Sequence, residues 1–266
     1  MSEHGSKRRC LLIGARGFVG THIEKLLRES EVDVIGTTRK LAAGDPDSWL
    51  QYNFPHDSIH GQIGERHFDF AIIAAKLAPA NIGACPLSII EAFDDLFSKL
   101  SRSIRSGMTY LSSDAVFSGV RGGYFETDAP DAAEPYGMMH VFAEQSLSKH
   151  VPNHLIVRPS FLFDVDYFHK DRRLSQLHGA LTSRTNFFGD TNVYKSPVRV
   201  AEGARIVVER TLERQTGIVH VPARRQSVYQ FFQESLAPLN LTRFRQYLVL
   251  RTSDKPSDTS LRSMFE

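Results

Sequence analysis

Several hydroxyl side chains in the middle of the chain lie at positions where they could take part in the reaction of a carbonyl group. Ser112 and Ser113 end an apolar run that predicts a strand, and Tyr136 begins a helical pattern after a proline-containing loop. A serine hydroxyl can bind a carbonyl oxygen while a nearby tyrosine hydroxyl delivers a proton to that oxygen. The pattern therefore indicates a reductase in which Tyr136 is the proton donor.

His140 stands one helical turn after Tyr136, at the place where a cation would assist the proton transfer. The unperturbed pKa of tyrosine is about 10, so the side chain needs a neighbouring positive charge to work near neutral pH. Imidazole reaches less far than lysine and has an unperturbed pKa of about 6.5. Three interpretations stay open: an adapted catalytic residue, a slower enzyme, or a cofactor-binding protein without turnover.

A glycine pattern near the start of the chain predicts a dinucleotide site. The segment GARGFVG at positions 14–20 follows an apolar run and opens a helical pattern. In such a turn the first glycine permits a tight bend, the second lets the backbone approach a pyrophosphate, and the third lets the helix pack against the strand. Phosphates are also favoured by the start of the helix. We expect cofactor contacts from Gly14, Arg16, Gly17, Phe18, Val19 and Gly20.

The end of the second predicted strand favours NADP over NAD. NAD sites normally carry a carboxylate here to hold the ribose hydroxyls, and positions 36–40 contain none. Arg39 could cover the 2′-phosphate of NADP with its planar guanidinium, with Arg16 on the other side. The alternative is a solvated loop charge at Arg39. Further expected cofactor contacts are Asn53, at the end of a third strand, and Ala74 and Ala75, at the end of a strand over 68–75.

These residues depend on an alternation of strands and helices through the first 160 positions. Short apolar runs predict strands over 10–14, 32–38, 68–75, 108–113 and 154–158. Helical patterns cover 18–29, 86–106 and 136–149, and the pattern over 86–106 carries one apolar stripe. Such alternation predicts an α/β fold with a doubly wound parallel sheet of the Rossmann type.

After Pro159 the pattern changes. Positions 160–199 are aromatic and polar without clear periodicity, which suits a substrate lobe. Helical patterns return over 200–212 and 228–236, with a strand over 217–221 between them. We expect a dinucleotide-binding domain over 1–160 and a smaller substrate-binding lobe over 161–266, with a soft boundary because later segments can return to the sheet.

Composition limits the function classes. The 266 residues are 41% hydrophobic and 23% charged, which is usual for a globular protein, and the net charge of +2 gives no electrostatic case for nucleic acid. Two cysteines suggest neither a disulfide framework nor a metal cluster, and the loose group His56, His60 and His67 has no acid or cysteine at ligand spacing. Without a membrane span or secretory signal, we expect a soluble cytoplasmic enzyme that binds no metal.

The order of short motifs resembles the extended short-chain dehydrogenase/reductase family. It is most similar to dTDP-4-dehydrorhamnose reductases and related nucleotide-sugar 4-ketoreductases. The matching segments extend over nearly the whole chain and lie at 14–20, 112–117, 124–128, 135–137, 143–144, 157–160, 195–197, 217–220 and 256–261.

The resemblance implies catalytic roles for three positions. Ser113 would be the catalytic hydroxyl and Tyr136 the proton donor. His140 takes the place of the family's lysine, whose side chain also holds the nicotinamide ribose. Asp114, next to the serine, would face the substrate.

The resemblance also implies a substrate with a diphosphate, which cationic side chains would bind. Arg158, Lys195 and Arg199 are the expected contacts, although surface charge is an equal alternative for Lys195 and Arg199. The expected activity is NADPH-dependent reduction of a 4-keto nucleotide-activated deoxysugar. The alternatives are a nucleotide-sugar epimerase or dehydratase, and a non-catalytic NADP-binding regulatory subunit.

A homodimer is a further expectation from the resemblance, because this family commonly pairs helices across an interface. The apolar stripe over 86–106, with the helix over 136–149, could form such an interface. A face buried within the chain explains the stripe equally well.

Overall fold

A computed structural model describes residues 7–75 and 87–265 of the chain. They fold into two compact units, and each unit takes segments from both sides of residue 160. Unit 1 consists of Met1–Ser112, Glu134–Val157 and Ala204–Val219, and unit 2 consists of Ser113–Ala133, Arg158–Gly203 and His220–Glu266.

A seven-stranded sheet forms the centre of unit 1. In spatial order its strands are β11 (Gly217–Val221), β6 (His154–Pro159), β5 (Ile104–Leu111), β4 (Phe68–Ile73), β1 (Arg9–Ile13), β2 (Asp33–Thr38) and β3 (Leu50–Gln51). The pairs from β6 to β3 are parallel, and Cys10 of β1 lies between Val34 and Phe70. Most strand residues are buried, as the apolar runs predicted for a sheet covered on both faces. The predicted doubly wound α/β fold is confirmed.

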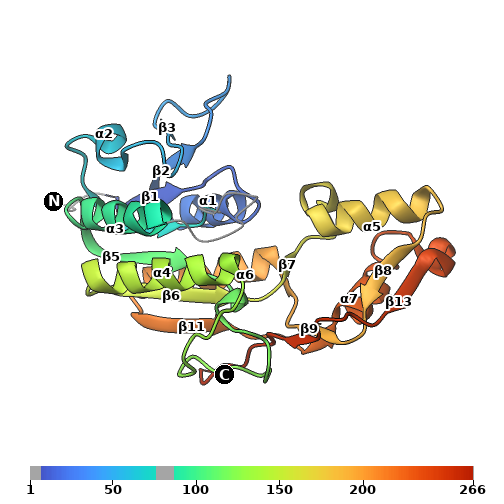
Figure 1. The fold of residues 1–266 in the computed structure, drawn as a ribbon. Helices are drawn as coiled ribbons and strands as arrows, with labels where there is room; N and C mark the ends of the chain where they lie inside the picture. The colour runs from blue at the N-terminus through green and yellow to red at the C-terminus, as the bar shows by residue number, and fades with distance from the viewer. Residues whose placement is uncertain (1–6, 76–86, 266) are drawn as a thin grey trace. The chain divides into compact units, whose positions relative to one another are not determined.

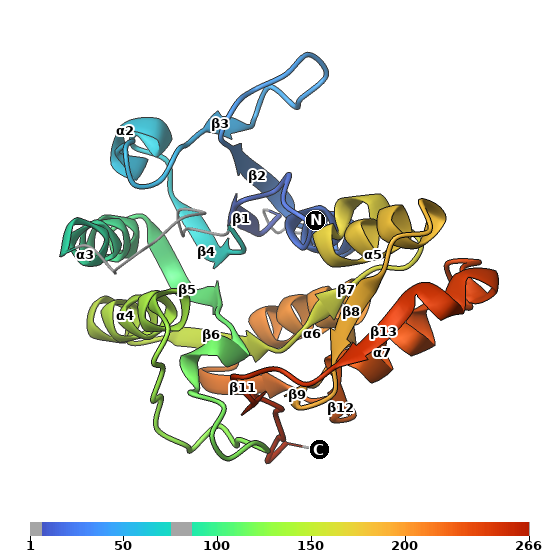
Figure 2. The same cartoon turned by 45° about the vertical axis from the view of Figure 1, so that its right-hand side comes forward.

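Helices cover both faces of this sheet (Figures 1 and 2). The helices of unit 1 are α1 (Gly20–Glu29), α2 (Ile59–Ile63), α3 (Leu87–Ser101), α4 (Pro135–His150) and α6 (Val200–Leu212), whose first residues belong to unit 2. Helices α3 and α4 pack side by side on one face (Figure 2), and α1 and α6 lie on the other.

Alternating side chains of β5 show the two faces directly. Tyr110 meets Phe97 of α3 edge-to-face at 6.1 Å between ring centroids. Its neighbour Thr109 points the other way and hydrogen-bonds Thr211 of α6 at 2.7 Å between hydroxyl oxygens. Successive strand residues face opposite sides, so Ser112 is expected on the α3–α4 side with Tyr110.

The apolar stripe of α3 is buried inside unit 1 rather than presented to a partner. Its members are Ile89, Phe93, Leu96, Phe97 and Leu100, each at most 4% exposed. Of the two explanations left open for this stripe, the structure supports the face buried within the chain.

The predicted helix over 86–106 is too long at its C-terminal end. Helix α3 ends at Ser101, and β5 already begins at Ile104, which pairs with Phe68 of β4. Ile104 continues the helical spacing of the stripe, but its backbone belongs to the sheet.

Unit 2 contains several small sheets and two helices. The strand pairs are β7 (Leu162–Phe163) with β10 (Val198–Arg199), β8 (Phe187–Asp190) with β13 (Leu248–Arg251), and β9 (Val193–Lys195) with both β12 (Gln226–Ser227) and β14 (Ser257–Asp258). Helices α5 (Arg172–Thr182) and α7 (Val228–Ser235) pack around a core that includes Leu174, Leu177, Leu181, Phe231 and Phe232. The short 3-10 turns are η1 (Asp114–Val116), η2 (Phe168–Lys170) and η3 (Thr242–Tyr247).

Two structural features are absent from the described residues. None of the helices there has the length and apolar character to cross a membrane. Within 7–75 and 87–265, no three histidine, cysteine, aspartate or glutamate side chains come together as a metal site would require.

Candidate active site and cofactor site

The glycine turn after β1 depends on close backbone approach. Gly14 has a φ of +92°, in the left-handed region that favours glycine, and a Cβ there would lie 2.7 Å from the backbone of Ala75. The N–H of Gly17 donates to the carbonyl oxygen of Gly14 at 2.8 Å. A Cβ on Gly20 would lie only 2.0 Å from that same oxygen. The sequence positions of these glycines therefore match the places where no side chain fits.

The start of α1 is arranged for an anion. The helix begins at Gly20, and Val19 precedes it without any side-chain cap on the first turn. Helix starts of this kind present N–H groups and the positive end of the helix dipole. Ala74 lies at the same carboxyl edge of the sheet, where its N–H donates to the carbonyl oxygen of Ile13 at 2.9 Å.

Arg16 is paired with a carboxylate that was not predicted as part of the site. It forms an ion pair with Asp45, and its guanidinium lies 5.7 Å from the centre of the Trp49 ring. Asp45 is held in turn by the N–H of Ala42 at 2.7 Å. Arg39 is exposed in the bend after β2.

Asn53 follows β3 and is half-buried. Its backbone N–H donates to a carboxylate oxygen of Asp57 at 2.7 Å, and its carbonyl oxygen accepts from His56 and Asp57. These contacts close a tight turn at the end of β3.

Tyr136, His140 and Tyr110 form a chain of contacts within unit 1. Helix α4 begins at Pro135, which suits the first helical position, so Tyr136 lies in the first turn. The Tyr136 side chain is 40% exposed, and its ring meets the His140 ring edge-on at 4.7 Å between centroids. Nδ1 of His140 hydrogen-bonds the hydroxyl of Tyr110 at 2.8 Å.

A second contact extends this polar face of α4. Glu144 stands one turn after His140, and its carboxylate accepts a hydrogen bond of 2.5 Å from the buried hydroxyl of Ser112. Positions 136, 140 and 144 share one helical face because they are four residues apart. Burial raises the pKa of Tyr110 well above its usual value, and the nearby Tyr136 and Glu144 raise it further. Tyr110 therefore keeps its proton.

In unit 2, the carboxylate of Asp114 is the centre of a buried polar network. It accepts hydrogen bonds from Lys195 at 2.9 Å, from Thr259 at 2.6 Å and from Ser160 at 2.8 Å. Ser113 precedes η1 and caps it, because its hydroxyl accepts the N–H of Ala115 at 3.1 Å. The same hydroxyl donates to Asp114 at 3.2 Å.

This network keeps Asp114 ionised. Burial by itself would raise the pKa of Asp114, but the charge of Lys195 and the hydrogen bonds from Thr259, Lys195 and Ser160 outweigh it, so the pKa is lowered. A carboxylate held in this way is a poor proton donor near neutral pH.

The two arginines expected at the substrate have different surroundings. Arg158 is fully buried, with its guanidinium 5.3 Å from the centre of the Phe117 ring. Arg199 is exposed and pairs with Asp166 at 3.4 Å. Arg199 can therefore reach a ligand in solvent, whereas Arg158 contributes to the interior of unit 2.

Models of two protein families match the chain. Residues 10–163 match the NAD dependent epimerase/dehydratase family, and residues 90–258 match the RmlD substrate binding domain. Each match extends over more than half of the sequence. The chain belongs to the epimerase/dehydratase and RmlD families. This confirms the family resemblance drawn from the motif order.

Known proteins with different names are similar to this chain. Methionine adenosyltransferase 2 subunit beta from Danio rerio is 25% identical over 242 residues, which cover 82% of this chain and 70% of that protein. A dTDP-4-dehydrorhamnose reductase structure from Clostridium acetobutylicum has 19% identity and a TM-score of 0.75, covering 96% of this chain and 90% of that one. The Bacillus anthracis enzyme in complex with NADP has 17% identity, the same TM-score and the same coverage. At these identities the structural similarity supports the fold.

Several residues of this RmlD family member were not predicted as part of the site. No local sequence pattern identified Tyr110 or Asp45 as site residues, because their contacts depend on how distant segments pack. Glu144 could have been found from its four-residue spacing after Tyr136 and His140. Ser160 and Thr259 lie in segments that match the family, yet their hydroxyls became visible as partners of Asp114 only in the structure.

Proposed function

We propose that this protein uses NADPH to reduce the 4-keto group of a nucleotide-activated deoxysugar. The observation that supports this best is the contact between Tyr136 and His140 on α4, with His140 fixed by Tyr110. It gives the proposed proton donor a defined imidazole neighbour at the position where related reductases carry lysine. NADPH, when bound, would supply the hydride.

The carboxyl edge of the unit 1 sheet fits a dinucleotide. Gly14, Gly17 and Gly20 leave room for a diphosphate, and the uncapped start of α1 offers N–H groups to it. We assign the 2′-phosphate to Arg39 and Arg16, because guanidinium groups bind phosphate through two parallel hydrogen bonds. Phe18, Val19, Asn53, Ala74 and Ala75 would complete the cofactor contacts.

His140 would act as a hydrogen-bond donor. Its Nδ1 is hydrogen-bonded to the hydroxyl of Tyr110 at 2.8 Å; when Tyr110 donates this bond, a neutral imidazole carries its ring proton on Nε2. An Nε2–H group can hold a ribose hydroxyl, as lysine does, but it lacks the positive charge that lowers a tyrosine pKa. This arrangement supports a reductase with slower turnover than one that carries lysine.

On the substrate side, we assign Ser113 to the carbonyl oxygen and Tyr136 to its protonation. Arg199 is exposed and would contact the diphosphate. Asp114 and Lys195 are bound to each other, so we assign them to shaping the substrate lobe around Ser113. The engagement of Asp114 also argues against a dehydratase, which would need it as a free acid or base.

A second candidate is a non-catalytic NADP-binding subunit. Two observations favour it: histidine replaces lysine at position 140, and one relative is named as a subunit of methionine adenosyltransferase. Under this alternative, the cofactor site would remain in use while Tyr136 and Ser113 would have no chemical role.

Turnover with a dTDP-4-keto-6-deoxyhexose separates the two candidates. NADPH oxidation is followed for the wild type, Tyr136→Phe, His140→Lys and the control Tyr167→Phe, which changes an exposed tyrosine of unit 2. We expect Tyr136→Phe to lower kcat about a hundredfold or more without loss of NADPH binding, and His140→Lys to raise kcat. Tight NADPH binding with no turnover in the wild type and in His140→Lys would overturn the reductase in favour of the subunit.

A further inference from the structure

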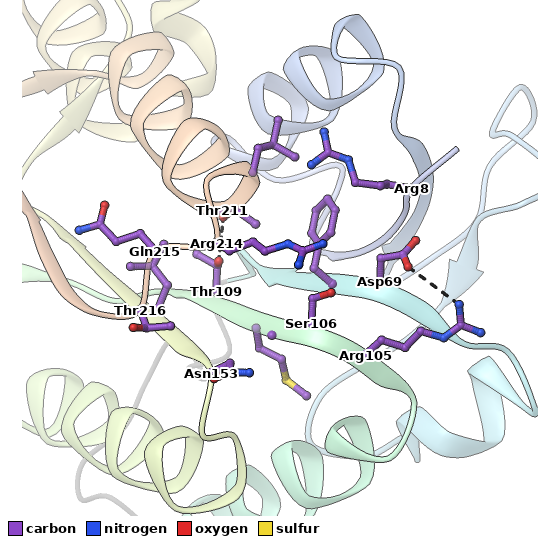
Figure 3. A pocket seen from close by; sticks show the side chains of 15 residues that line it. Arg8, Asp69, Arg105, Ser106, Thr109, Asn153, Thr211, Arg214, Gln215 and Thr216 are labelled. Carbon is purple, nitrogen blue, oxygen red and sulfur yellow. Dashed lines mark hydrogen bonds and ion pairs between the residues drawn. The ribbon is translucent and has the colours of Figure 1, made fainter. Parts of the chain in front are cut away.

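An arginine-lined pocket lies at the amino edge of the unit 1 sheet, and nothing in the proposed function uses it. Its volume is about 370 Å³, within the range of small-molecule sites. Figure 3 shows Arg214 extending into it from the segment after α6, with Arg8 and Arg105 on the other side. The pocket thus draws positive charge from three separate segments of the chain.

The charges around this pocket are not balanced. Asp69 is the acidic side chain in its lining, and it already accepts the backbone N–H of Arg9 at 2.7 Å and lies 4.0 Å from Arg105. Within the described part of the chain, the guanidinium groups of Arg8 and Arg214 have neither an ion-pair nor a hydrogen-bond partner. Two guanidinium groups that line one pocket without a carboxylate between them would attract an anion.

The rest of the lining suits a ligand that also carries a ring. Ser106, Asn153 and Thr216 offer hydroxyl and amide groups elsewhere in the lining (Figure 3). Phe70 of β4 and Leu212 of α6 supply apolar surface in the lining. Small-molecule sites typically combine an apolar surface with a few polar groups in this way.

The pocket is separate from the proposed cofactor site in the same unit. Several of its residues precede or begin strands: Arg8 precedes β1, Asn153 precedes β6, and Ser106 lies near the start of β5. The glycine turn and Ser112 follow the opposite ends of β1 and β5. Along β5, the six residue-to-residue steps from Ser106 to Ser112 span about 20 Å.

We propose that this pocket binds a phosphate-bearing small molecule with an aromatic ring, of the class of a nucleoside monophosphate. The phosphate lies between Arg8 and Arg214, which can each offer two donors to its oxygens. The ring lies on Phe70 and Leu212, and the hydroxyl and amide groups of the lining contact the sugar.

Calorimetric titration of the NADPH-loaded protein with AMP tests this proposal. NADPH is kept saturating so that AMP cannot occupy the cofactor site. Inorganic phosphate and adenosine are titrated in parallel, to measure how much of the affinity comes from the phosphate group and how much from the nucleoside. We expect AMP to bind more tightly than either. Arg8→Gln and Arg214→Gln should each weaken AMP binding about tenfold, while the matched control Arg102→Gln, an exposed arginine outside the pocket, should not.

Two further measurements distinguish a loss of AMP binding from a loss of folding. The NADPH affinity and the unfolding temperature of each variant show that it is folded, because neither Arg8 nor Arg214 lies at the cofactor edge. Absence of saturable AMP binding would overturn the proposal, and so would an AMP affinity in both pocket variants equal to that of the wild type. Binding that occurs only without NADPH would also overturn it. Turnover is not part of the measurement, so an inactive protein gives an equally clear result.

Discussion

At the scale of single residues, the ion pair between Arg16 and Asp45 bears on cofactor choice. Asp45 is 7% exposed in its side chain and faces an arginine that we assign to the 2′-phosphate of NADPH. To bind that phosphate, Arg16 must share or leave its carboxylate, and Asp45 repels the incoming charge. Under this assignment, the pair would weaken NADPH binding relative to a site with Arg16 alone.

We expect Asp45→Asn to strengthen NADPH binding about fivefold, the value of a partly exposed ion pair, and to leave NADH binding unchanged. Fluorescence titration with both cofactors measures this. Asp47→Asn, in the same loop and exposed, is the matched control. Weaker NADPH binding in Asp45→Asn would show instead that Asp45 positions Arg16 for the phosphate.

Local sequence was sufficient for some of these residues and insufficient for others. The glycines could be predicted because each turn position has a steric requirement that involves near neighbours and the strand beside it. Tyr110 could not, because its hydroxyl meets His140 only through the packing of α4 on β5. The Asp114 network likewise joins positions 114, 160, 195 and 259, which no local pattern connects.

At the scale of elements, the turn between β1 and α1 has no room for a side chain at Gly20. A methyl group there would overlap the carbonyl oxygen of Gly14 at 2.0 Å, so the helix would have to move away from the strand. The start of α1 would then no longer present its N–H groups to a diphosphate.

We expect Gly20→Ala to lower the free energy of unfolding by at least about 1 kcal/mol and to weaken NADPH binding. Urea denaturation and cofactor titration measure the two effects. Gly179→Ala in α5 is the control: it is exposed, a Cβ there meets nothing within 4 Å, and the change should stabilise by about 0.5–1 kcal/mol. A stable Gly20→Ala protein with unchanged NADPH affinity would contradict this account of the turn.

Elements with long, regular patterns were predictable, and short strands were not. The helix over 200–212 and the strand over 217–221 appear at the predicted residues as α6 and β11. No helix or strand was predicted within 160–199, where the sequence shows no clear periodicity, and the structure has α5 and several strands of two to four residues there. Strands of that length show no periodicity. Helix α5 did carry a signal, since Leu174, Leu177 and Leu181 follow helical spacing after an Asp171 cap.

At the scale of the whole molecule, unit 2 contains several carboxyl groups whose pKa is lowered. In each, burial acts to raise the pKa, and hydrogen bonds or nearby cations lower it by more. The groups are Asp114, Glu126, Asp128 and Asp258. A carboxyl group with a lower pKa in the folded state stabilises the fold at neutral pH, because the unfolded chain binds its proton first as the pH falls.

We therefore expect unit 2 to lose stability as the pH falls below about 4, the usual carboxyl range. Hydrogen exchange at a series of pH values should show α5 and α7 losing protection before β1 and β5 of unit 1. Asp114→Asn should make the pH dependence of unit 2 shallower. Earlier loss of protection in unit 1 would contradict the assignment.

The path of the chain has a practical consequence for engineering. The backbone passes between the two units five times, after residues 112, 133, 157, 203 and 219. No single cut yields a complete unit, so a truncated gene would encode two unfinished hydrophobic cores. A chimera that exchanges the substrate specificity of this protein with that of a relative must graft three separate segments together.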